Sequence, residues 1–181
     1  MTNTLSPVKC IAFDCFGTIF DMKNVPKKEI KAYASHVRKE NFDPFDFPKL
    51  WYHLPVFPDV TKGINLLQKQ GFFCVTLSNG SKELLEHASA NCGIKWNHII
   101  DLSLHGVYKP KIEAYLSIEK DLGFKVSETM MVTANVGSGD LKQAHEIGMN
   151  YQLIRHGYSD NIFELAELLL NKIEMNTEKV N

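Results

Sequence analysis

Short apolar runs alternate along this chain with segments of helical periodicity, and this alternation limits the available folds more than any other feature. Apolar runs predict strands at residues 8–13, 72–77, 98–100, 130–133 and 151–154. Amphipathic segments predict helices at residues 27–40, 60–70, 82–91, 111–122, 140–147 and 161–173. Such alternation is typical of parallel strands joined by right-handed crossovers. We therefore expect an α/β fold with a Rossmann-like, doubly wound parallel sheet.

The interval from residue 21 to residue 58 interrupts the alternation. It contains the predicted helix 27–40, followed by a stretch rich in proline and aromatic residues. We interpret 21–58 as a small insertion after the first strand, above a core formed by residues 1–20 and 59–174. Residues 175–181 are expected to form a frayed C-terminal tail.

The composition indicates which kinds of partner the protein binds and in which cellular compartment it works. The net charge of −1 and the scattered lysines give no field that would attract nucleic acid or an anionic membrane surface. No apolar run approaches the roughly 20 residues that span a bilayer. The four cysteines form no CxxC pair, and the N-terminus lacks the apolar stretch of a signal peptide. We expect a cytoplasmic protein with a small-molecule substrate, and we leave a homodimer open.

Four polar clusters stand after predicted strands, at residues 14–18, at residues 78–81, at Lys109 and at residues 133–140. Turn chemistry alone would explain any one of them. Parallel strands, however, bring their carboxyl ends to one edge of the sheet, where ligands bind in this class of fold. The seven histidines show no metal-ligand spacing. Together the clusters predict one binding or catalytic site, without a histidine metal centre.

Four segments carry a resemblance to a known family: IAFDCFGTIFD, TLSNGS, VYKPKIEAY and MVTANVGSGD. In this order they resemble the motifs of the haloacid dehalogenase superfamily, in particular of its L-2-haloacid dehalogenase branch. The resemblance implies a hydrolase whose nucleophile is Asp14, with Lys109 keeping that carboxylate ionised. It also identifies 21–58 as a reduced form of the family's long helical cap.

The same resemblance assigns roles around the nucleophile. It implies that Thr18 and Ser78 form hydrogen bonds near Asp14, and that Asn79 faces the leaving group or the substrate carboxylate. Asn135 resembles the family's asparagine of the fourth motif. Asp140 resembles the aspartate that orders the hydrolytic water, although residues 136–139 make this motif about two residues longer than the dehalogenase pattern.

Further residues are expected to contact the substrate. Cys15 and Phe16 belong to the first motif, and Tyr115 matches a family tyrosine at the same offset from Lys109. Tyr115 is expected either to hydrogen-bond in the site or to be a core aromatic residue. Arg38, the only arginine of the insertion, either clamps the substrate carboxylate or lies solvated on the helix surface.

Phe16 decides which reaction we expect. Phosphatases of the superfamily carry a second aspartate at this position, where it protonates the leaving alkoxide. Phenylalanine has no proton to give, whereas a halide leaves without one. We therefore predict hydrolysis of a small 2-halo acid through a covalent aspartyl ester, with no metal or other cofactor. The alternatives are a magnesium-dependent phosphatase or phosphonatase, whose ion Asp14, a backbone carbonyl and Asp140 would hold, and a non-catalytic family member.

Overall fold

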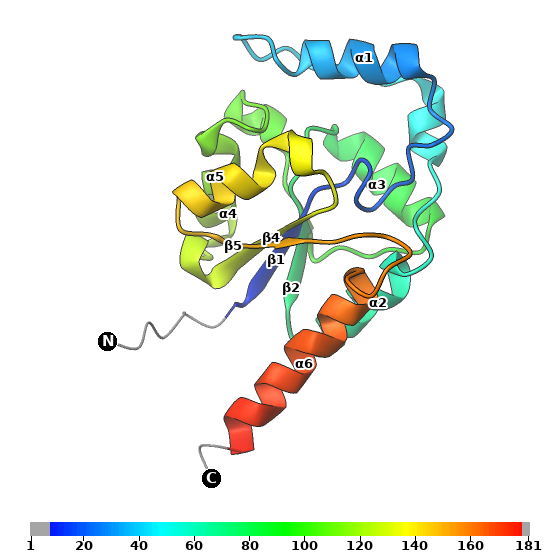
Figure 1. The fold of residues 1–181 in the computed structure, drawn as a ribbon. Helices are drawn as coiled ribbons and strands as arrows, with labels where there is room; N and C mark the ends of the chain where they lie inside the picture. The colour runs from blue at the N-terminus through cyan, green and yellow to red at the C-terminus, as the bar shows by residue number, and fades with distance from the viewer. Residues whose placement is uncertain (1–7, 179–181) are drawn as a thin grey trace.

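The fold is a five-stranded parallel sheet between helices (Figure 1). The computed structural model describes residues 8–178. The strand order is β3-β2-β1-β4-β5, and all neighbouring strands are parallel. The strands are β1 Cys10–Phe13, β2 Phe73–Thr76, β3 His98–Ile99, β4 Thr129–Thr133 and β5 Asn150–Leu153. The predicted α/β class with a Rossmann-like parallel sheet is confirmed.

The central strand β1 explains why the first apolar run has no polar alternation. Every residue from Cys10 to Phe13 is fully buried. β1 pairs with β2 on one side and β4 on the other, so that Phe13 lies opposite both Thr76 and Val132. A parallel strand covered on both faces needs apolar side chains at every position. β1 consequently fixes the place where the next residue, Asp14, leaves the sheet.

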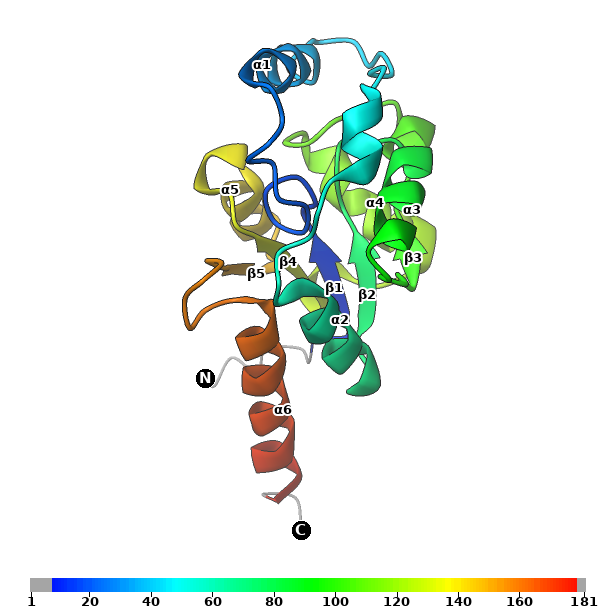
Figure 2. The same cartoon turned by 90° about the vertical axis from the view of Figure 1, so that its right-hand side faces the viewer.

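Helices cover both faces of the sheet. Side chains of α2 Val60–Lys69, α3 Lys82–Asn91 and α6 Ile162–Glu178 share one core cluster with Ile11 and Phe13 of β1. Side chains of α4 Ile112–Leu122 and α5 Asp140–Glu146 share the other cluster with Cys10 and Ala12. Figure 2 shows α2 and α6 on one side of the sheet. No helix among the described residues is both long and apolar enough to cross a membrane.

Two helix ends differ from the sequence-based expectation. α1 spans Lys27–His36 and ends four residues before the predicted boundary. The chain then turns back, and the His36 ring forms a hydrogen bond with the carbonyl of Asp43. At the other end of the chain, α6 continues to Glu178. Residues 175–178, expected in the frayed tail, are therefore helical, and 179–181 lie outside the described residues.

Residues 21–58 lie above the carboxyl end of β1 and β2, where α1 crosses the top of the molecule (Figure 2). α1 buries none of its residues, so it depends on other contacts for its position. The short 3-10 helix Lys49–His53 supplies one of them, because the fully buried Trp51 donates a hydrogen bond from Nε1 to Glu29 of α1 at 3.0 Å.

An aromatic cluster, formed by Phe16, Tyr33, Phe45, Phe47 and Trp51, joins this segment to the core. Neighbouring ring centroids lie 4.9–5.8 Å apart, mostly in tilted or edge-on arrangements. These are favourable geometries for aromatic pairs. Phe16, from the loop after β1, thereby anchors the segment that covers the site.

Candidate active site

The loop after β1 places a carboxylate and a hydroxyl next to each other. The carbonyl of Cys15 accepts hydrogen bonds from the backbone N–H groups of Thr18, Ile19 and Phe20, which closes a tight turn. Gly17 has φ +84° in this turn, a conformation that glycine adopts without strain. The turn brings Thr18 back to Asp14, and Thr18 Oγ1 donates to Asp14 Oδ2 at 3.0 Å.

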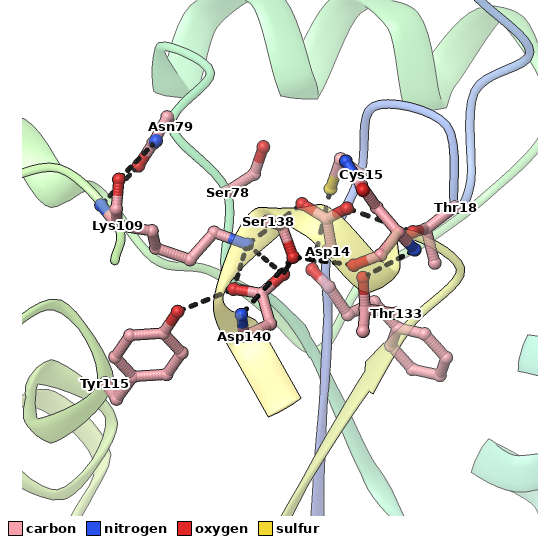
Figure 3. A network of polar contacts seen from close by, with 12 residues as sticks. Asp14, Cys15, Thr18, Ser78, Asn79, Lys109, Tyr115, Thr133, Ser138 and Asp140 are labelled. Carbon is pink, nitrogen blue, oxygen red and sulfur yellow. Dashed lines mark hydrogen bonds and ion pairs between the residues drawn. The ribbon is translucent and has the colours of Figure 1, made fainter. Parts of the chain in front are cut away.

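Lys109 lies between two carboxylates (Figure 3). Its ammonium donates to Asp14 Oδ1 at 2.9 Å and to Asp140 Oδ2 at 3.1 Å. The backbone of Lys109 is held by Asn79, whose Oδ1 accepts from Lys109 N at 2.7 Å and whose Nδ2 donates to Lys109 O at 3.0 Å. Asn79, from the polar cluster 78–81, thus holds Lys109 so that its ammonium lies at the end of β1.

Asp140, the first residue of α5, is completely buried and fully engaged. Besides Lys109, it accepts hydrogen bonds from the hydroxyls of Tyr115 at 2.6 Å and Ser138 at 2.9 Å. Buried charges are stable only with such partners. Tyr115 is therefore both a core aromatic residue and a hydrogen-bond donor in the site, the two alternatives that the sequence left open.

Charge and burial compete at these groups. Burial raises the pKa of Asp14 above its usual range, although Lys109 lowers it and Thr18 also favours the ionised form. Burial alone would raise the pKa of Asp140 too, but Lys109, Tyr115 and Ser138 together hold it below its usual value. The two carboxylates in turn outweigh the burial of Lys109 and raise its pKa, so this ammonium stays charged.

A cavity of about 390 Å³ opens above this network. Asp14, Lys109 and Asp140 lie on its polar side. Its remaining walls come from the loops after β1, β2 and β4, from the loop before α4, and from α1 and the residues that follow it: Phe16, Tyr33, Ala34, Val37, Arg38, Asn79, Pro110, Asn135, Gly137, Ser138 and Gly139. An ionised carboxylate in a partly apolar cavity is suited to attack a small organic electrophile.

Some predicted residues occupy positions that differ from the expected contacts. The side chain of Cys15 is fully buried and donates towards the carbonyl of Phe13, so it does not line the cavity. Ser78 Oγ accepts from the backbone of Gly80, and no hydrogen bond joins it to Asp14 among the described residues. Asn135 lines the cavity, but its Oδ1 accepts from Gly137.

Sequence reasoning missed Tyr33 and Ser138. Tyr33 has helical spacing with other apolar residues of α1, a pattern that predicts only packing. Ser138 has a clearer signal, since it lies two residues before Asp140 in a polar loop, where short side chains often accept or donate locally. Arg38 is exposed just beyond α1, as the solvated alternative expects, and it also lines the cavity; its role as a clamp for the substrate carboxylate stays a prediction.

Comparison with known proteins assigns the chain to a family. Residues 28–136 match the model of the haloacid dehalogenase-like hydrolase family. The chain belongs to this family. The matched region begins after Asp14 and ends before Asp140, so the comparison supports hydrolase membership without assigning the nucleophile.

Individual relatives are dehalogenases. Haloacetate dehalogenase H-2 of Moraxella sp. (strain B) is 29% identical over 87 residues, which are 47% of this chain and 39% of that protein. The chain thus spans about two fifths of the length of this curated relative.

Solved structures show the same fold at low sequence identity. A defluorinating L-2-haloacid dehalogenase has a TM-score of 0.72 at 23% identity, over 90% of this chain and 95% of that one. The L-2-haloacid dehalogenase of Xanthobacter autotrophicus with covalently bound chloropropionic acid has a TM-score of 0.68 at 18% identity, over 91% and 83%. These likenesses show the fold, and the match to the family model confirms the predicted family.

Proposed function

We propose that this haloacid dehalogenase-like hydrolase removes halide from a small 2-halo carboxylic acid through a covalent ester at Asp14. The observation that carries the proposal is the arrangement at the end of β1. There the carboxylate of Asp14 contacts the ammonium of Lys109, and Phe16 lines the cavity at the sequence position where phosphatases of the superfamily carry a second aspartate. The site thus has a nucleophile without an acid for an alkoxide leaving group.

The first step displaces the halide. A carboxylate oxygen of Asp14 attacks C2 of the substrate, the new C–O bond forms, and the carbon–halogen bond breaks with its electron pair leaving on the halide. Lys109 keeps Asp14 ionised, because an adjacent cation favours the charged form. Phe16, Tyr33 and Val37 give the reacting carbon an apolar surrounding.

The second step hydrolyses the ester. Water ordered near Asp140 attacks the carbonyl carbon of the esterified Asp14, and the bond between this carbon and the substrate oxygen breaks. One proton of the water passes to the departing alkoxide, which gives the 2-hydroxy acid, and the other is released to solvent, so Asp14 returns as a carboxylate. Lys109 stabilises the oxyanion that forms on the way, as fixed positive groups do in acyl transfer.

Arg38 supplies the expected anchor for the substrate carboxylate. It lies at the end of α1, it lines the cavity, and its side chain is exposed. A guanidinium can bind a carboxylate through two parallel hydrogen bonds, which fixes orientation as well as charge. The substrate would then bridge Arg38 and Asp14.

Magnesium fits these residues poorly. The two carboxylates that would hold the ion, Asp14 and Asp140, already share the ammonium of Lys109 at 2.9 and 3.1 Å. A divalent ion would have to displace that ammonium, and the side chain of Phe16 offers no oxygen in its place. We therefore propose turnover without a metal, and the phosphatase or phosphonatase alternative is the outcome that a metal requirement would support.

The test is a single turnover in ¹⁸O-water after a screen of small haloacids and phosphoesters, each with chelator and with added magnesium. We expect halide release in chelator and ¹⁸O in the carboxylate of Asp14, with no turnover by Asp14→Asn. Label found only in the product, together with an active Asp14→Asn, would overturn the covalent mechanism. Phosphoester hydrolysis restored by magnesium would assign the phosphatase alternative, and absence of all turnover would favour a non-catalytic protein.

A further inference from the structure

A histidine far along the sequence contacts the loop that carries the nucleophile. His156 follows β5 and stacks on Phe57, with ring centroids 3.6 Å apart and an interplanar angle of 8°. Its Nδ1 lies 3.1 Å from Asp59 Oδ1, and its Nε2 lies 2.8 Å from the carbonyl oxygen of Thr18. The ring is thus fixed by three contacts, one of which reaches the turn after Asp14.

Both ring nitrogens face groups that only accept hydrogen bonds. Thr18 O is a carbonyl oxygen, and Asp59 is a carboxylate whose other oxygen already accepts from the backbone N–H of Ile162 at 3.0 Å. Two donors on one imidazole exist only in the protonated ring. The geometry therefore fits an imidazolium that pairs with Asp59 and donates to Thr18.

Thr18 connects His156 to the nucleophile, because its carbonyl contacts His156 and its hydroxyl contacts Asp14. Its hydroxyl accepts from Ala134 N at 2.9 Å and donates to Asp14 Oδ2 at 3.0 Å, so the position of its backbone sets the direction of this donor. In the described part of the chain, His156 is the only group that donates to the carbonyl of Thr18. Losing that donor would leave the carbonyl unsatisfied and free the turn to shift.

We propose that His156, held by Asp59, is a positioning residue that keeps the Thr18 hydroxyl aimed at Asp14. The proposal deepens the proposed function, because it concerns the orientation of the same nucleophile. His156 does not line the cavity above Asp14, so its effect would act through Thr18 and not through the substrate. kcat should therefore respond more than KM.

Two substitutions separate this role from a general structural one. Glutamine at position 156 places an amide N–H₂ near the position of Nε2 and can still donate to Thr18. Asparagine places its amide near Nδ1, where it can reach only Asp59. The proposal predicts that His156→Gln retains kcat within about threefold, whereas His156→Asn loses about tenfold, the effect of one net hydrogen bond. A purely structural role of the Asp59 contact would reverse this order.

The pKa of Asp14 can be measured without any turnover, so the positioning role of His156 can be tested separately from the proposed reaction. The carboxyl ¹³C signal of Asp14 can be titrated by NMR in the wild type and in both variants. Since the hydrogen bond from Thr18 lowers the pKa of Asp14, His156→Asn should raise that pKa and His156→Gln should raise it less. These shifts are expected even if no haloacid is turned over, so a failed reaction and a failed positioning role give different results.

Asp59→Asn is the second variant, in case His156→Asn folds poorly. An asparagine still accepts from Ile162 N but removes the carboxylate that holds His156, so kcat should fall and the pKa of Asp14 should rise in the same direction as in His156→Asn, by less because the ring can still donate to Thr18. Glu128→Gln is the matched control, because Glu128 pairs with Lys9 at 2.6 Å just before β4, at the opposite end of the strands. Equal kcat and equal Asp14 pKa in His156→Asn, His156→Gln and wild type would overturn the proposal.

Discussion

At the scale of single residues, the site depends on one ammonium shared by two buried carboxylates. Lys109 is only 6% exposed, and Asp140 is not exposed at all. Without Lys109, the negative charges of Asp14 and Asp140 would face each other in a low-dielectric environment. The ammonium therefore supports both the stability of the site and the ionised state of Asp14.

Lys109→Met tests the effect of this charge on activity. The substitution removes the group that lowers the pKa of Asp14, so this pKa should rise further. We expect the acidic limb of the kcat/KM profile to move to higher pH by about 1–3 units, the usual effect of one opposite charge. The exposed ammonium of Lys142 serves as the control, and Lys142→Met should leave the limb in place. An unchanged limb in Lys109→Met would contradict the assigned role.

The same substitution should lower stability in a pH-dependent way. Breaking a buried ion pair from one side costs roughly 3–5 kcal/mol at neutral pH. A carboxyl group whose pKa is raised by folding stabilises the fold at low pH, and this contribution is lost as the pH rises through the raised pKa. Urea unfolding should therefore show a smaller loss for Lys109→Met at pH 5 than at pH 8. A loss that grows towards acid would have the wrong sign.

Residues that follow strands were the ones that the sequence could identify. Asp14, Lys109 and Asp140 follow short apolar runs in polar loops, and parallel topology predicts that they meet. Tyr33 carries no such signal, because it lies on an apolar helical stripe. His156 does follow β5, but its partner Thr18 lies 138 positions away, so its contact could not be anticipated. Their contacts follow from tertiary packing, which local patterns do not encode.

At the scale of elements, α1 covers the cavity although none of its residues is fully buried, and only Ile30 and Tyr33 pack partly against the core. Its predicted length was wrong because residues 37–40 continue the helical pattern, yet the chain turns back to bring Phe45 and Phe47 to the aromatic cluster. Two of its side chains, Tyr33 and Ala34, line the cavity, and Arg38 follows at its end. The position of α1, and with it the shape of the cavity, therefore depends on the aromatic residues that pack against the helix.

Trp51→Ala tests how α1 is held. Trp51 packs edge-on against Phe16 at 4.9 Å and binds Glu29 of α1. Removing a buried tryptophan typically costs about 3–5 kcal/mol. We expect amide hydrogen exchange to accelerate in residues 27–36 more than in β1 and β4. Equal acceleration throughout the chain would mean that Trp51 supports the whole core and not this attachment.

Arg38 at the end of α1 gives a second prediction for this element, which rests on the proposed function. Arg38→Met should raise KM by about 10–100-fold, the range for one charged hydrogen-bonding group, with a smaller change in kcat. Arg38→Lys should recover part of the loss because it keeps the charge without the bidentate fork. Steady-state kinetics with Lys39→Met as control decides this, and an unchanged KM would place the carboxylate elsewhere.

At the scale of the whole molecule, the parallel sheet could be anticipated from alternation, but the close packing of α2 on α6 could not. Nothing in the sequence near Gly63 marks it as a contact with residues about 100 positions later. In the structure, a Cβ added at Gly63 would lie 2.6 Å from Ile162 Cγ2 and 2.8 Å from the backbone of Ile162 and Phe163. The absence of a side chain lets the two helices approach.

Gly63→Ala should therefore destabilise the protein even though alanine favours helices. The intrinsic helix preference of alanine over glycine is about 1 kcal/mol, while overpacking a tight contact costs about 1–3 kcal/mol. Two of the three clashing atoms are backbone, so α2 and α6 must separate instead of one side chain turning aside. We expect a net loss of stability by urea denaturation, whereas Lys62→Ala, on the exposed face of α2, should change the stability by less than about 0.5 kcal/mol.

The strain of Gly63→Ala should also spread to the site, because Asp59 at the start of α2 holds both Ile162 and His156. A Gly63→Ala variant as stable as the wild type would show that α6 is not seated on α2 at this distance.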